Sequence, residues 1–200
     1  MGTILFRRRA VPALAAALFF IVFSSVSIAS SRHRELGRLF DEEGISTSAR
    51  TRIDRSYGVV LKAGGEKKEV LSLIENCLEG GFTGGQIARV LTLLAQLELS
   101  DLPAESFLSK IHEGVAKRVP VPKILAAAEQ EALNLKKAEN LLNALVLRGH
   151  DIEDDDQEDL IPAIAEALYS GKSLEEVRDI LTSSLDKGEN LRKVRRKLLR

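Results

Sequence analysis

The stretch that decides the fold is VLSLIENCLEGGFTGGQIARVL, residues 70–91. Its apolar side chains recur three and four positions apart on both sides of Gly80-Gly81, which is the spacing of two amphipathic helices joined by a tight turn. Thr83 and Gln86 open the second half with the spacing of a capping box, a pattern that marks a helix N-terminus. Residues 70–91 therefore predict an αα-hairpin.

The hairpin pattern occurs twice more along the chain. Residues 107–128, FLSKIHEGVAKRVPVPKILAAA, repeat it at an offset of 37, and residues 160–181, LIPAIAEALYSGKSLEEVRDIL, repeat it after a further 53. Pro120 presets the backbone of the second helix in one copy, and Ser173 and Glu176 form a capping box in the other. The sequence therefore predicts three hairpins in series.

A small residue occupies the position that faces the hairpin partner in each copy: Cys77, Gly114 and Ala167. Glycine inside a helix costs about 1 kcal/mol relative to alanine, so Gly114 is interpreted as a packing choice that lets two helix backbones approach closely. Cys77 is interpreted as a buried small apolar residue, and a reactive or intermolecular thiol is the alternative.

Helical periodicity continues between the second and third hairpins. Over residues 121–148 apolar side chains recur three or four apart, from Ile124 to Leu145, and Gly149 ends the run. Aromatic residues make up only 4% of the chain, and no convincing strand is found. We therefore predict an all-α fold of antiparallel helical hairpins, arranged as a bundle or a short solenoid behind an N-terminal signal segment.

Residues 1–29 have the three parts of a secretory signal peptide. Three arginines at residues 7–9 supply the positive region, an apolar stretch covers residues 10–29, and SIA at residues 27–29 is a small-residue cleavage pattern. The alternative is an uncleaved anchor, since about 20 apolar residues can span a bilayer. Both interpretations place the rest of the chain outside the cytoplasm, either periplasmic or secreted, or held at the inner membrane.

Residues 30–65 are polar and rich in arginine, and they predict a linker that contains one short helix between Ile53 and the glycines at 64–65. This linker is interpreted as a solvated spacer. Contact between its arginines and anionic lipid head groups is the alternative. Residues 66–200 form the predicted hairpin-repeat domain.

The composition excludes several classes of site. The chain has 200 residues, with 29 basic and 29 acidic side chains and one cysteine. A single cysteine excludes a disulfide scaffold and a cysteine-rich zinc site, and the balanced charge argues against nucleic acid as a partner. No two histidines have the spacing of a helical metal site. We therefore expect no metal and no other cofactor.

Two charged clusters are candidate sites. The acidic run at residues 151–159 lacks the glycine of an EF-hand loop, so it is interpreted as a solvated cap of the next helix, and calcium binding stays open. The basic C-terminal segment has one apolar stripe, as a packed helix with outward cations has, and contact with an anionic membrane surface is the alternative. Its cations are Arg192, Lys193, Arg195, Arg196 and Lys197.

The sequence contains no catalytic constellation. His112 and Glu113 are adjacent, and such a pair can transfer protons, but neither a nucleophile nor an oxyanion pocket accompanies them. The glycines around residue 84 lack the preceding strand and the lysine of a phosphate-binding loop. We therefore expect that the protein is not an enzyme.

The segment EGVAKRVP at residues 113–120 resembles an EG-x-AK-x-VP motif of uncharacterised bacterial secreted helical proteins, with Arg118 where that pattern has glycine. The resemblance covers residues 82–135 and implies a secreted bacterial helical module, without implying an activity. Three charged residues of this region are exposed by helical register, and they form a candidate binding face, with a merely solvated face as the alternative. The candidate binding face consists of Lys110, Glu113 and Lys117.

These features favour a non-catalytic helical interaction or structural module of the bacterial cell envelope, because hairpin repeats present contact surfaces rather than closed pockets. The alternative is a membrane-associated helical protein, held by an uncleaved N-terminal helix or by the basic C-terminal helix. The expected partner is a protein or another envelope component, and an anionic membrane surface is the alternative.

Overall fold

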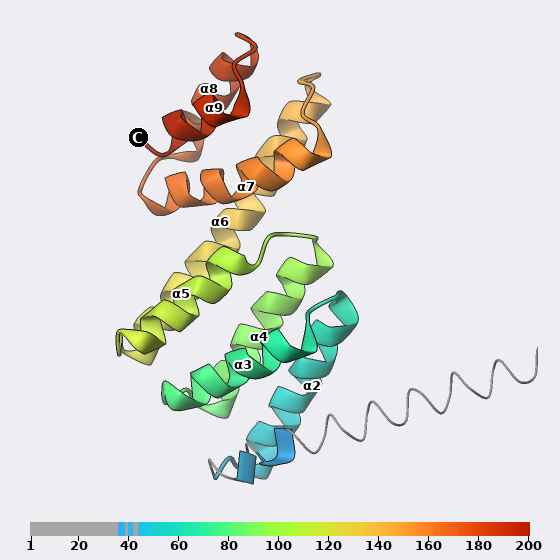
Figure 1. Cartoon of the computed structure of the whole chain (residues 1–200), viewed down its shortest axis with the longest axis vertical. Helices are drawn as coiled ribbons and strands as arrows, with labels where there is room; N and C mark the ends of the chain where they lie inside the picture. The colour runs from blue at the N-terminus through green and yellow to red at the C-terminus, as the bar shows by residue number, and fades with distance from the viewer. Residues whose placement is uncertain (1–35, 39, 42–43) are drawn as a thin grey trace, which may run out of the picture. The chain divides into compact units, whose positions relative to one another are not determined.

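The computed structural model describes residues 36–38, 40–41 and 44–200, and the predicted signal segment lies outside them. The chain divides into two units after Gly44, and the second unit is Ile45–Arg200. The second unit contains eight α-helices (Figure 1). They are α2 (Thr47–Ala63), α3 (Lys67–Glu79), α4 (Gly84–Leu99), α5 (Glu105–Ala116), α6 (Val121–Leu147), α7 (Asp154–Tyr169), α8 (Leu174–Leu185) and α9 (Leu191–Leu198).

The all-α prediction is confirmed: among the described residues every regular element is a helix, and none is a strand. Short turns join successive helices, which therefore run antiparallel to one another. The three predicted hairpins correspond to α3–α4, α5–α6 and α7–α8. Alternate helices also pack on each other, as α2 does on α4, α3 on α5 and α4 on α6.

Capping boxes begin α4 and α8, which confirms two of the predicted helix starts. The Thr83 amide donates to Oε1 of Gln86 at 2.8 Å, and the Gln86 amide donates to Oγ1 of Thr83 at 3.4 Å. At α8 the Ser173 amide donates to Oε2 of Glu176 at 2.7 Å, and the Glu176 amide donates to Oγ of Ser173 at 3.1 Å. Each box provides partners for two N–H groups that a helix start would otherwise leave unpaired.

The turn inside each hairpin has the same backbone conformation. Gly81 (φ 77°), Arg118 (φ 53°) and Gly171 (φ 102°) occupy equivalent positions, and all three are left-handed. Glycine adopts this conformation freely, whereas a residue with a side chain pays roughly 1–2 kcal/mol for it. The turns between the hairpins also contain left-handed residues, at Gly64, Asp101 and Gly149, so this is the common way in which these helices end. Among the three hairpin turns Arg118 is the strained member.

Gly114 lies where α5 and α6 approach each other, and Cys77 lies in the core. A Cβ atom on Gly114 would lie 2.8 Å from Cγ1 of Ile124 in α6, so glycine allows α5 to pack against its hairpin partner. Cys77 is fully buried in α3, and burial raises the pKa of its thiol to about 12. Both residues are packing residues, as predicted.

Helix α2 packs on α4, two elements further along the chain. Gly84, the first residue of α4, lies against Ala49 near the start of α2. At the other end, Glu98 of α4 lies close to Gly64, which follows α2. The two helices therefore run in the same direction, as alternate helices in a series of hairpins do.

Because α2 is packed rather than solvated, the helical unit begins earlier in the chain than the sequence predicted. Ile53, Tyr57 and Val60 of α2 are buried, and the compact unit starts at Ile45. The sequence instead predicted a solvated linker up to residue 65. The two boundaries differ because an amphipathic helix has the same spacing whether or not another helix covers its apolar face, and here α4 covers it.

Helix α6, with 27 residues, is the longest element and contacts α4, α5 and α7. Its opposite side is open to solvent, where Leu133 and Leu147 are 49% and 88% exposed. No helix in the described part of the chain is both long enough and apolar enough to span a lipid bilayer. Leu133 also lines the groove described next, which lies between α4 and α6.

Candidate functional site

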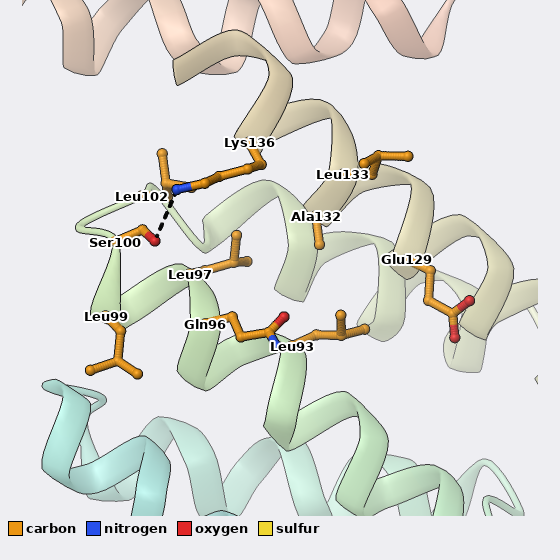
Figure 2. A pocket seen from close by; sticks show the side chains of 10 residues that line it. All are labelled: Leu93, Gln96, Leu97, Leu99, Ser100, Leu102, Glu129, Ala132, Leu133 and Lys136. Carbon is orange, nitrogen blue, oxygen red and sulfur yellow. Dashed lines mark hydrogen bonds between the residues drawn. The ribbon is translucent and has the colours of Figure 1, made fainter. Parts of the chain in front are cut away.

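A groove with a volume of about 540 Å³ lies between α4 and α6 (Figure 2). Helix α4 and the turn that follows it form one wall, and α6 forms the other. Leu97, Leu102 and Ala132 are the buried part of its lining, and all three are apolar. The other lining residues are Leu93, Gln96, Leu99, Ser100, Glu129, Leu133 and Lys136.

Two leucines of this groove expose apolar surface to solvent. Leu99 of α4 is 69% exposed, and Leu133 of α6 is 49% exposed. A single exposed leucine is common on protein surfaces and needs no explanation. Here two of them lie at opposite margins of one groove, and each adds apolar surface to its rim (Figure 2). The groove is therefore suited to contact with an apolar surface.

The charged groups at the rim of the groove already have partners. Lys136 Nζ lies 2.6 Å from Oε2 of Glu139, and it also donates to Oγ of Ser100 at 3.3 Å across the groove (Figure 2). Glu129 forms an ion pair with Arg89 of α4, with 2.5 Å between Nε and Oε1. Because these charges are paired within the protein, the groove offers a ligand mainly apolar contacts.

The candidate binding face of Lys110, Glu113 and Lys117 is only partly formed. Glu113 and Lys117 make an exposed ion pair on α5, and the Lys117 hydrogen bond and charge lower the pKa of the Glu113 carboxyl. Lys110 is half-buried rather than exposed, because it reaches α7. Its Nζ lies 3.7 Å from Oε2 of Glu166 and 3.8 Å from the centre of the Tyr169 ring, in a cation–π geometry.

The basic C-terminal segment forms α9, whose apolar residues Val194 and Leu198 are fully buried. The helix packs on α7 and α8. Some of its cations are held by acids: Lys193 Nζ lies 2.8 Å and Lys197 Nζ 2.5 Å from the Glu189 carboxylate. Arg195 also lies 3.7 Å from Oδ1 of Asp159 in the acidic run. Within the described residues Arg192 and Arg196 form no ion pair.

The acidic run lies at the start of α7, where negative charge suits the helix dipole. In the part of the chain that the structure describes, no group of three or more His, Cys, Asp or Glu side chains is placed to hold a metal ion. His112 is half-buried on α5, and His150 Nδ1 lies 3.9 Å from Oδ1 of Asp186. The two histidines lie on different segments and form no shared site with each other.

Sequence reasoning did not find the groove between α4 and α6. One signal was present: Leu133 does not belong to the apolar stripe of α6, which includes Ala132, Leu135 and Leu142. A large apolar residue outside the buried stripe of a helix is a candidate contact residue. Leu99 gave no comparable signal, because it lies at the end of its helix, where periodicity carries little information.

Comparison with protein-family models, with curated proteins and with solved structures finds no significant match to this chain. Its function is therefore inferred from its own residues and geometry.

Glu189→Gln is expected to weaken the attachment of α9. Hydrogen bonds from Lys193 and Lys197 lower the pKa of the Glu189 carboxyl from 4.5 to about 2. A carboxyl with a lowered pKa in the folded state stabilises the fold above its unfolded pKa, and it loses that contribution as the pH falls through the folded value. The variant should therefore melt below the wild type at pH 7, and the difference should shrink between pH 4.5 and about 2.

Circular dichroism melts at several pH values measure this difference. The matched control is Glu75→Gln, which alters an exposed acid in the middle of α3 for which no partner is seen among the described residues. A difference between wild type and Glu189→Gln that is the same at pH 7 and in acid would contradict the role of the ion pairs.

Proposed function

We propose that the protein is a non-catalytic interaction module of the bacterial cell envelope, a short solenoid of helical hairpins that binds a partner protein in the groove between α4 and α6. The observation that carries the proposal is the pair of exposed leucines, Leu99 and Leu133, beside an apolar groove. The charged side chains at the rim of the groove, Glu129 and Lys136, form ion pairs within the chain. The apolar surface of the groove is therefore the part that a partner would cover.

The proposed occupant is an apolar face of a partner helix. Side chains on α4 and α6 are spaced three and four apart, and the ridges of a third helix pack into a groove between two others. Binding of an amphipathic helix in an apolar groove is also a recurring mode of peptide recognition. The envelope location rests on the signal segment and on the resemblance around residues 113–120.

A photocrosslinking residue placed at Leu133 tests this proposal in intact cells. The control places the same residue at Lys123, which is exposed on α6 outside the groove. We expect a discrete crosslinked partner from position 133 only, and we expect its loss when Leu99→Glu is added, because the carboxylate opposes apolar contact. Equal products from both positions, or none from either, would rule out the groove as a binding site.

A second candidate function is a membrane-associated protein, held by an uncleaved leader or by α9. Arg192 and Arg196 support it, because these two cations on α9 have no ion-pair partner among the described residues. Cell fractionation separates the two candidates: release by osmotic shock favours the interaction module, and retention in the membrane fraction favours the alternative. Retention that is lost when α9 is truncated would assign the anchoring to α9.

A further inference from the structure

A second groove, also of about 540 Å³, lies between α6 and α8. Leu141 and Leu145 of α6 are the buried part of its lining, and Leu174 of α8 is 45% exposed in it. The other lining residues are Lys137, Asn140, Ala144, Arg148, Glu175 and Arg178. This groove is thus partly apolar, like the first, and it has more charged residues.

One exposed stripe of α6 connects the two grooves. Leu133, Lys137, Asn140, Ala144 and Leu147 are spaced alternately four and three residues apart, so they lie on one face of the helix. Leu133 lines the first groove, and Lys137 and Ala144 line the second. At a rise of about 1.5 Å per residue the stripe is roughly 21 Å long. A helix of five to six turns is slightly longer than the stripe and would cover it.

The second groove has an excess of positive charge. Its acid, Glu175, pairs with Arg178, with 3.3 Å between Oε1 and Nη2, and Arg178 also lies 3.5 Å from Oδ1 of Asp179. Lys137 and Arg148 are exposed, and neither forms an ion pair within the described residues. The charged side chains of the second groove that form no ion pair are therefore cations.

We propose that the exposed stripe of α6 and its two flanking grooves bind one amphipathic helix of a partner protein, whose flank carries acidic side chains against Lys137 and Arg148. This proposal rests on the proposed function and states the chemistry of the partner. The apolar face of that helix contacts Leu133, Ala144 and Leu147, and its carboxylates approach the unpaired cations. Complementary charge selects the partner and sets the direction in which its helix lies.

Two synthetic helices of about 18 residues test the proposal by fluorescence anisotropy with the full chain. Both have leucines three and four positions apart, and one has glutamates on its flank where the other has lysines. We expect the acidic helix to bind about tenfold more tightly than its basic twin, with the difference falling as salt increases. Lys137→Glu and Arg148→Glu should each weaken the acidic helix about fivefold, and the control Lys123→Glu should not.

The outcomes separate this inference from the proposed function. If both helices bind equally and Leu133→Glu abolishes the binding, the inference of an acidic partner is wrong, while the groove remains the proposed binding site. If neither helix binds and no crosslink forms at position 133, both this inference and the proposed function are wrong. Phosphatidylglycerol vesicles provide a third measurement. If the vesicles bind the chain, if Lys137→Glu abolishes that binding, and if the acidic helix does not bind, the surface recognises lipid. The proposal of a partner helix is then wrong.

Discussion

Gly84→Leu is expected to lower the free energy of unfolding by about 3 kcal/mol, because overpacking at a close helix contact forces the backbones apart. Gly84 is buried, and a Cβ atom there would overlap the side chain of Ala49 and lie 3.2 Å from its Cα. The contact joins α2 to α4, the most extensive helix pair of the second unit. Leucine is itself a good helix former, so helix propensity does not explain a loss of stability.

The neighbouring Gly85 supplies the matched control. A Cβ atom at Gly85 would have Arg52 Nη1 as its nearest neighbour, at 3.9 Å, which is an ordinary contact. Gly85→Leu is therefore expected to leave stability unchanged or to raise it by up to about 1 kcal/mol, since glycine is the poorer helix former. Urea denaturation measures both variants. Equal effects at the two positions would show that α2 and α4 do not approach as described.

Tyr57→Ala is expected to cost about 3 kcal/mol, in the range measured when a large buried aromatic side chain is removed from a core. Tyr57 is 1% exposed and lies in α2, within the segment that the sequence predicted to be a linker. A side chain in a solvated spacer would contribute almost nothing to stability. The variant therefore tests whether the repeat domain begins at Ile45 or after residue 65.

Val59→Ala on the same helix is the control for this measurement. Val59 is 45% exposed, so its truncation should change the free energy of unfolding by less than about 0.5 kcal/mol. The two variants are compared by urea denaturation of the full chain. If Tyr57→Ala is as mild as Val59→Ala, α2 does not belong to the cooperative unit.

Much of the fold could be predicted because its signals are local. Thr83 and Ser173 begin helices through hydrogen bonds to residues three positions later, and these bonds form within one turn. Gly149 ends α6 in the left-handed conformation that glycine tolerates. Spacing, capping and turn residues act over a few positions, so a single sequence reveals them.

The candidate site could be predicted only in part. The basic stripe of α9 and the ion pair of Glu113 with Lys117 follow from helical register. The half-burial of Lys110 does not, because it depends on Glu166 and Tyr169, which lie more than 50 residues away in sequence. The groove around Leu133 depends in the same way on where α4 lies against α6.

The sequence by itself determined where α4 and α8 begin, where α6 ends, which helices are joined by the hairpin turns, and which face of each is apolar, since these follow from interactions between residues close along the chain. Only the tertiary structure decided that α2 packs on α4, and that Leu99 and Leu133 stay uncovered while Tyr57 is buried. The physical reason is that burial depends on which distant helix covers a face, and an apolar stripe has the same spacing whether or not it is covered.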